Sequence, residues 1–292
     1  MRIEDALRRF EVQLQADGRS HHTIAQYRRH IALFCHWLRH VAHVRDEVEK
    51  LDHQLVAGFL ASKEANTRPD GGQKLATSTN CLRSSLRGFL AYCHRAGFIP
   101  NDPGQLIRRA VCSPPPPRAL SENDQRRLLD TLSKAKGPEA ERDHMLFHLL
   151  LSAGLRIGSA MALKVEDVDL NKSEICLRTA KGNRPDVALL GRGIRMHLAR
   201  YLKTRGLGPL FPGYNGTAMS TRHAQRRLAM WAKRAGIQSK VSPHLLRHCF
   251  GMRVYRETGD ILLAQQALGH QSIASTMIYA RCDRERLRKA LT

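Results

Sequence analysis

The last third of the chain contains a spaced set of polar side chains that suits chemistry on a phosphate ester. His244 and Arg247 lie three residues apart, and Tyr279 follows an LGH motif that ends in His270. Arg156 lies upstream, after an apolar run. Arginines and histidines around a tyrosine suit a dianionic phosphorane, because charge grows on its non-bridging oxygens. The order and spacing together indicate a phosphodiester-cleaving site with tyrosine as the attacking group.

Each of these residues also has an ordinary interpretation when taken alone. An isolated tyrosine such as Tyr279 is more often a core residue, and Arg156 could be a surface arginine at the end of a helix. His244 and Arg247 follow Ser242-Pro243, a helix-start signal, so both side chains are expected to face one anion from the first helical turn.

A metal site is disfavoured by the neighbours of the histidines. His244, His248 and His270 could supply ligands, but clustered carboxylates or cysteines are missing from this half, and arginine would repel a cation. The sequence also contains no P-loop. We therefore expect no metal and no cofactor. Lys181, on a predicted hairpin turn, could donate a proton to a leaving group, although most turn lysines are only solvated.

The charge of the chain indicates a polyanionic partner. Its 292 residues carry a net charge of +22, and residues 187–256 contain fourteen Lys or Arg and no acid. DNA or RNA is the usual partner of such a surface. Candidate nucleic-acid contacts lie on two predicted helices, where the N-terminal pair could equally be solvated charges: Arg83 and Arg87 in the first, and Arg222, Arg226 and Arg227 in the second.

Cysteine usage and hydropathy bear on the compartment. The seven cysteines are scattered, odd in number and never form a CxxC pair, which favours a reducing compartment. The N-terminus is charged from its second residue, and the apolar stretch around Met145–Leu155 is too short to span a bilayer. These features predict a cytoplasmic protein without a membrane partner.

A run of four prolines suggests where the chain divides. We expect a helical domain over 1–112, a proline-rich linker over 113–120 and a second domain over 121–292. Helical periodicity appears at Thr23–Leu38, Thr77–Ala96, Glu122–Leu132, Arg142–Ala153, from Gly193 onward and at Ser220–Gly236. Short strands are predicted at Ala162–Val168, Glu174–Thr179 and Pro185–Leu190, with a hairpin turn over 180–183. The predicted fold is mainly α with a small antiparallel sheet.

Four stretches of the sequence carry a family resemblance that spans essentially the whole chain. They are "LLLSAGLRIGSAMALKVEDVDL", "TAKGNRPDVALL", "SPHLLRHCFGMRV" and "LAQQALGHQSIASTMIYA". In this order they resemble the tyrosine recombinases of the phage integrase family, most closely the bacterial Xer-type recombinases. The resemblance implies an N-terminal helical, SAM-like core-binding domain and an α+β catalytic domain with a C-terminal tail helix.

The resemblance also implies a role for each matching residue. Arg156 and Arg247 match the arginines that hold the scissile phosphate, and His244 matches the general acid/base. Lys181 matches the lysine that protonates the departing 5′ oxygen. His270 matches a residue that hydrogen-bonds the phosphate, and Tyr279 matches the nucleophile that forms a 3′-phosphotyrosine. His248, which follows the HxxR motif, is expected to give structural support.

The activity implied is site-specific recombination of double-stranded DNA through a Holliday junction. Four protomers, of this chain or with a related recombinase, would assemble on two recombination sites in the nucleoid. We expect no separate arm-binding module before the N-terminal helical region, which argues against a phage integrase of that type. The target sequence stays open, as does the role, whether chromosome-dimer resolution, plasmid-dimer resolution or movement of a mobile element. The tail, with Leu287 and Leu291 one turn apart, could dock on a neighbouring protomer or on its own domain.

One position departs from the family pattern. Many relatives carry an acid three residues after the first arginine, where this chain has Ser159. A hydroxyl adds no charge pairing, so Arg156 is expected to be held less firmly. Two alternatives also stay open: a type IB topoisomerase that relaxes DNA alone, and a non-catalytic DNA-binding accessory protein.

Overall fold

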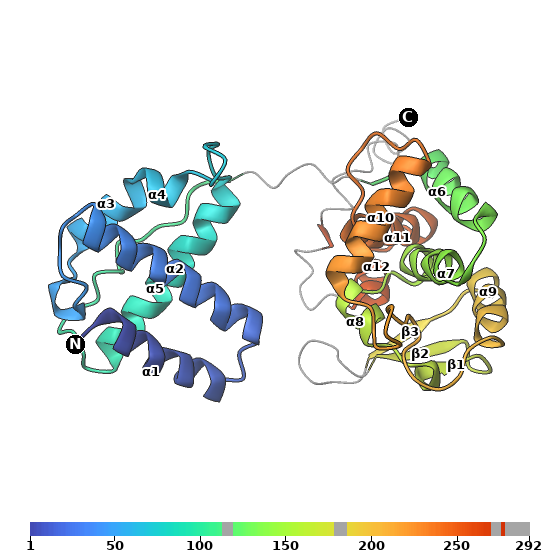
Figure 1. The fold of residues 1–292 in the computed structure, drawn as a ribbon, viewed down its shortest axis with the longest axis horizontal. Helices are drawn as coiled ribbons and strands as arrows, with labels where there is room; N and C mark the ends of the chain where they lie inside the picture. The colour runs from blue at the N-terminus through green and yellow to red at the C-terminus, as the bar shows by residue number, and fades with distance from the viewer. Residues whose placement is uncertain (113–118, 178–185, 270–275, 278–292) are drawn as a thin grey trace. The chain divides into compact units, whose positions relative to one another are not determined.

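The computed structural model of the chain describes residues 1–112, 119–177, 186–269 and 276–277. They fall into two units, Met1–Pro115 and Pro116–Thr292 (Figure 1). Each unit has its own hydrophobic core. Among the described residues, no helix is both long enough and apolar enough to cross a membrane.

The first unit is helical throughout its regular structure. Ser20 starts the second helix by accepting a hydrogen bond from the Thr23 N–H group, and Gly97 follows the last helix with a φ of 74°. The helices predicted at Thr23–Leu38 and Thr77–Ala96 are confirmed, with ends shifted by one or two residues. The elements are α1 (Ile3–Ala16), α2 (His21–His40), the 3₁₀ turn η1 (Val48–Lys50), α3 (His53–Ala61), α4 (Lys63–Asn66) and α5 (Ala76–Arg95).

Aromatic side chains join the helices of the first unit. Phe10 of α1 meets Tyr27 of α2 edge to face, with ring centroids 5.1 Å apart, and lies 4.9 Å from the ring of Tyr92 of α5. Phe34 of α2 packs on Phe59 of α3 at 5.0 Å. Such pairs add stability beyond the apolar area that they bury. They fix α1, α2, α3 and α5 around one core.

The second unit mixes helices with a small sheet. Ser121 caps its first helix by accepting from the Asp124 N–H group at 3.0 Å, and the helix begins at Glu122, where the predicted periodicity began. The helices are α6 (Glu122–Lys134), α7 (Pro138–Ala153), α8 (Ile157–Ala162), α9 (Arg192–Leu202), α10 (Thr221–Arg234), α11 (Pro243–Thr258) and α12 (Ile261–Leu268).

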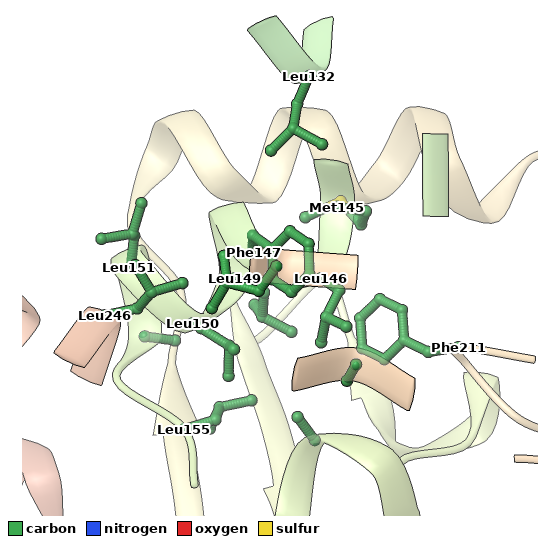
Figure 2. Close-up of a cluster of buried hydrophobic side chains, with 14 of the residues drawn as sticks. Leu132, Met145, Leu146, Phe147, Leu149, Leu150, Leu151, Leu155, Phe211 and Leu246 are labelled. Carbon is green, nitrogen blue, oxygen red and sulfur yellow. The ribbon is translucent and has the colours of Figure 1, made fainter. Parts of the chain in front are cut away.

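Helix α7 is the centre of the second unit. Leu146, Leu149 and Leu150 are fully buried, so this helix is apolar on most sides, as expected for a helix enclosed by others. Its neighbours are α6, α9, α10 and α11. Figure 2 shows its leucines packed with Leu132 of α6 and Leu246 of α11. Because α7 is held on most sides, the residues that follow it, Gly154 to Arg156, start from a fixed position.

Three short antiparallel strands form the sheet in the order β1 (Val168–Asp169), β2 (Glu174–Leu177) and β3 (Asp186–Leu189). Cys176 of β2 lies opposite Val187 of β3. The prediction of a strand over Ala162–Val168 holds only at Val168, which begins β1, because α8 extends to Ala162 and a 3₁₀ turn, η2 (Val165–Asp167), follows. Between them, Leu163 is buried in extended backbone, and its carbonyl oxygen accepts from the Leu210 N–H group. The predicted hairpin turn over 180–183 lies outside the described residues. The mainly α fold with a small antiparallel sheet is confirmed.

Candidate active site

Arg156 lies in the connection between α7 and α8, and not at the end of a helix as the sequence suggested. α7 ends at Ala153, and Gly154 takes the left-handed conformation with φ 62° and ψ 25°. Glycine adopts this conformation without the clash that a β-carbon brings, so it stops the apolar helix. The half-buried Arg156 then immediately precedes α8.

The start of α11 carries His244 and Arg247. Ser242 caps the helix by accepting from the Leu245 N–H group at 3.2 Å, and Pro243 occupies the first helical position. Proline is favoured there because its missing N–H group would have had no helical partner. The predicted helix start is thus confirmed. His244 and Arg247 both line the same cavity as Arg156.

Main-chain oxygens at two helix ends hold the two arginines. Arg247 is only 4% exposed, and its Nη1 and Nη2 atoms donate to the carbonyl oxygens of Gly154 and Leu268. The Nη2 atom of Arg156 donates to the carbonyl oxygen of Gly269 at 2.9 Å. Carbonyls at a helix C-terminus have no intrahelical partner and carry partial negative charge. They therefore suit a guanidinium group.

These side chains surround one cavity of about 430 Å³. No carboxylate is among the described residues that line it, so the two guanidinium groups set its charge. A planar guanidinium can bind two phosphate oxygens at once. The cavity therefore has the charge and donors for a phosphodiester. Its lining consists of Leu155, Arg156, Ile157, Gly158, Pro243, His244, Arg247 and His248.

The two histidines of α11 form a pair at the rim of the cavity. The rings of His244 and His248 meet edge to face with centroids 4.5 Å apart. Desolvation lowers the pKa of His244, and the positive charges of Arg247 and Arg156 lower it further. Desolvation, with His244 and Arg247 nearby, lowers the pKa of His248 to about 4. A neutral imidazole at neutral pH can accept a proton from a reacting group.

Three of the site residues expected from the sequence lie outside the described residues: Lys181, His270 and Tyr279. The structure thus brings together Arg156, His244 and Arg247 of that set. In the described part of the chain, no set of histidines, cysteines and carboxylates is arranged to hold a metal ion. Ser159 lies on α8, and no hydrogen bond joins it to Arg156 among the described contacts; Arg156 is held by Gly269 instead.

The outer face of α10 carries the strongest candidate contacts to nucleic acid. Arg222 and Arg226 are exposed and one helical turn apart, and Lys233 is exposed two turns after Arg226. Residues three and four apart share a helix face. Their ammonium and guanidinium groups therefore form one positive row, which we call the α10 basic row, of Arg222, Arg226 and Lys233.

Arg227, the third arginine predicted on this helix to contact nucleic acid, is already bound to carboxylates of α7. Its Nε atom donates to Asp143 Oδ2 at 2.5 Å, and its Nη1 atom lies 3.0 Å from Glu139. Asp143 is fully buried and also accepts from Trp231 Nε1 at 2.8 Å and from Arg142 Nη2 at 2.9 Å. Arg227 is an internal residue of this network, because a buried carboxylate needs such partners.

In the first unit, the two candidate arginines are not equivalent. Arg83 is half-buried, and its Nη1 atom donates to Thr79 Oγ1 at 2.9 Å. Arg87, one turn later on α5, is exposed, and none of the described contacts engages its side chain. Arg87 is therefore the more available of the two for an external anion.

Sequence reasoning missed the residues that hold the arginines. Gly154, Leu268 and Gly269 act through their carbonyl oxygens, which no side-chain pattern reveals. The available signal was glycine after an apolar helical run, which marks a helix end but not what the end binds. Arg227 and Trp231 were missed as partners of Asp143 for a similar reason, because they meet it only through packing of α10 against α7.

Comparison with known proteins shows the family to which the chain belongs. Residues 118–286 match the family model "Phage integrase family", and residues 7–97 match "Phage integrase, N-terminal SAM-like domain". A curated relative, tyrosine recombinase XerC of Chromobacterium violaceum, is 30% identical and aligns over 98% of this chain and 93% of its own. The chain therefore belongs to the phage integrase family, as a site-specific recombinase of the tyrosine type.

Solved structures show the same fold. XerH site-specific recombinase, bound to difH substrate in a pre-cleavage complex, has 22% identity and a TM-score of 0.71, covering 92% of this chain and 79% of its own. A lambda integrase tetramer bound to a Holliday junction has 18% identity and a TM-score of 0.72, covering 93% and 78%.

Proposed function

We propose that this recombinase cuts and rejoins double-stranded DNA at a specific site through a covalent bond between Tyr279 and a 3′ phosphate. The observation that carries the proposal is the convergence of Arg156, His244 and Arg247 on one cavity whose described lining has no carboxylate. Two fixed cations at a cavity suit an anion whose charge grows during the reaction.

Each residue has a stated part in the first step. Arg156 and Arg247 hold the non-bridging oxygens, and His270 donates a hydrogen bond to the phosphate. The Tyr279 oxygen forms a bond to phosphorus while the bond to the 5′ oxygen breaks. The phenol proton passes to His244, which its low pKa keeps neutral and ready to accept. The departing 5′ oxygen takes its proton from Lys181.

Rejoining reverses these events. A 5′ hydroxyl attacks the phosphotyrosine, the phosphodiester forms again and the tyrosine recovers its proton. The covalent intermediate keeps the energy of the broken diester, so the residues present suffice without a metal or a nucleotide. His248 supports His244 through the edge-to-face contact of their rings.

The remainder of the chain binds and places the DNA. In this proposal residues 1–112 are a core-binding domain, 113–120 a linker and 121–292 the catalytic domain with a tail helix. Arg222 and Arg226 contact the phosphate backbone from the α10 basic row. In the first domain, Arg87 makes a corresponding contact, and Arg83 assists from its half-buried position.

Assembly and location follow from the reaction. Exchange between two sites needs four active protomers, and lambda integrase forms a tetramer on a Holliday junction. We infer a tetramer on two sites, made of this chain alone or with a related recombinase. It works in the cytoplasm on DNA of the nucleoid, a reducing setting that accords with the unpaired cysteines of the described residues.

The test traps the covalent intermediate. Purified protein is incubated in EDTA with randomly nicked genomic DNA from its own source, because a nick opposite the break lets the 5′ end diffuse away. SDS-resistant adducts are collected and sequenced. We expect one shared sequence, and a synthetic nicked duplex of that sequence should form the same adduct. Tyr279→Phe should abolish the adduct with gel-shift affinity nearly unchanged.

A control variant and two further outcomes distinguish this proposal from the rival functions. Tyr214→Phe makes the same change at a tyrosine that is 95% exposed, and it should leave the adduct intact. An adduct from Tyr279→Phe would refute the nucleophile. Relaxation of any supercoiled plasmid, without a preferred sequence, would favour a topoisomerase. Tight binding with no adduct would favour an accessory protein.

A further inference from the structure

The two guanidinium groups of the candidate site share one anchor at the end of α12. The carbonyl oxygen of Leu268 accepts from Arg247, and the next carbonyl oxygen, of Gly269, accepts from Arg156. These two acceptors are adjacent in the chain, whereas the arginines come from different parts of the unit. The spacing of the arginines is therefore coupled to the direction of two consecutive peptide groups.

The conformation of Gly269 determines that direction. Its φ of 56° and ψ of 45° lie in the left-handed region, and its N–H group closes the end of α12 on Gln265 and Gln266. A left-handed residue turns the chain away from the helix axis, so the carbonyls before and after the turn point to different partners. Glycine adopts this conformation freely, and asparagine is the side-chain-bearing residue that tolerates it best.

The anchor is neutral, and this matters for the charge of the cavity. A carboxylate in the same place would hold a guanidinium by cancelling much of its charge, whereas a helix end offers only partial negative charge. The positive charge that both arginines exert on His244 accords with guanidinium groups that are not cancelled. Ser159, where an acid would sit on α8, adds none.

We propose that Gly269 is a positioning residue for the reaction: its left-handed backbone aims the carbonyl oxygens of Leu268 and Gly269 at Arg247 and Arg156, and so sets the spacing of both without a carboxylate. This inference rests on the proposed function. Gly269 acts through the two arginines, and its side-chain hydrogen touches no substrate in this scheme.

The experiment compares three variants of the full chain on the nicked duplex in single-turnover cleavage. Gly269→Ala should slow adduct formation on the order of a hundredfold, the cost of misplacing catalytic groups by about an ångström. Its affinity for the DNA should stay within about twofold, because binding spreads over many phosphates. Gly269→Asn should recover most of the cleavage rate, since asparagine keeps the left-handed turn.

Gly259→Ala is the matched control. Gly259 ends α11 with a φ of 72°, also left-handed, and its carbonyl oxygen holds neither arginine. It should lose thermal stability as Gly269→Ala does, yet cleave at the unsubstituted rate well below its Tm. A role of Gly269 in folding alone would instead make Tm and cleavage fall together in both alanine variants.

The outcomes separate the two proposals. If the unsubstituted protein forms no adduct, the proposed function fails. If it forms the adduct and Gly269→Ala cleaves equally fast, the function stands and the positioning role is wrong. Equal impairment of Gly269→Asn and Gly269→Ala would also overturn it. Should Gly269→Ala fail to fold, Gly269→Ser and Gly259→Ser replace the alanine pair, because serine also disfavours the left-handed turn, and only Gly269→Ser should cleave slowly.

Discussion

The ring of Phe250 occupies the space into which a β-carbon on Gly154 would project. Gly154 also has a φ of 62°, so two independent constraints keep this position a glycine. Its carbonyl oxygen accepts from the buried Arg247. The packing of Phe250 against Gly154 therefore affects the position of the carbonyl oxygen that holds Arg247 in the candidate site.

Gly154→Ala should therefore destabilise the second unit and impair cleavage together. Moving the Phe250 ring costs about 1–3 kcal/mol, and the left-handed backbone costs roughly another 1 kcal/mol. We expect the Tm to fall by roughly 5–10 °C, as measured by calorimetry. Gly193→Ala on α9 meets open space and should leave the Tm near its starting value. An unchanged Tm for Gly154→Ala would contradict the steric argument.

Removing the buried carboxylate of Asp143 should be far more damaging than removing a surface one. Asp143→Ala leaves Arg142 without its charge partner and Arg227 with Glu139 alone, at a cost of about 3–5 kcal/mol. Glu122→Gln breaks an ion pair with Arg256 whose side chains are both more than half exposed, and should cost less than about 1 kcal/mol. Urea unfolding of both variants checks the contrast. Equal losses would mean that the network contributes little.

Acid should lower the stability of the second unit, because three histidines lie close together where α7 meets α9. The ring centroids of His148 and His197 lie 5.0 Å apart, with His144 at 5.8 Å from His148. Desolvation, then His197, His144 and Arg253, lowers the pKa of His148 to about 4. The unfolded chain binds this proton near pH 6.5 and the folded chain does not. Stability is therefore full above pH 6.5 and falls as the pH drops toward about 4.

His148→Leu tests this dependence. Thermal unfolding between pH 7.5 and 4.5 should show a shallower loss of Tm in the variant than in the unsubstituted protein. Some dependence should persist, because the pKa of His248 is lowered in the same direction. His21→Gln, at an exposed histidine of α2, serves as the control and should keep the original slope. A variant as acid-sensitive as the original protein would exclude His148 as a source.

Salt dependence should distinguish the exposed arginines of α10 from the internal one. Each phosphate that the protein no longer neutralises should lower the slope of log Kd against log salt by about 0.9. Arg222→Gln and Arg226→Gln should each show such a decrease by fluorescence anisotropy, with the Tm unchanged. Arg200→Gln on α9 makes the same charge change at another exposed site and should preserve the slope. If all three behave alike, the effect is one of net charge only.

Arg227→Gln gives the complementary result. Its guanidinium is bound to Asp143 and Glu139, so the variant should lose stability and leave the salt slope nearly unchanged. A drop in slope without a drop in Tm would instead support the phosphate contact that the sequence suggested for Arg227. The sequence alone could not separate Arg226 from Arg227, because neighbours on a helix face different directions that only packing fixes.

Local signals predicted much of the fold. The helix starts at Ser121 and Ser242 are set by capping within a few residues, so short-range chemistry was sufficient. The strand expected over Ala162–Val168 failed because a short apolar run fits either a strand or a packed helical turn. Within this run only Val168 begins a strand, because the residues before it include the end of α8 and the turn η2.

The sequence indicated three residues that line the cavity, but not the main-chain oxygens that hold its two arginines. Spacing placed His244 and Arg247 on one helix, and their convergence with Arg156 is seen in the cavity. The contact from Arg247 to Leu268 and that from Arg156 to Gly269 join residues of three helix ends. Long-range hydrogen bonds to main-chain atoms leave no pattern in the side chains, so they could not be expected from sequence.

The carbonyl oxygens that hold Arg156 and Arg247 belong to the main chain, and every amino acid supplies one. Substitution at these positions can redirect an acceptor but cannot delete it. The support of the two arginines therefore does not depend on an acidic side chain, and Ser159 on α8 supplies none. The site depends instead on the left-handed backbone at Gly154 and Gly269, where few residues other than glycine fit.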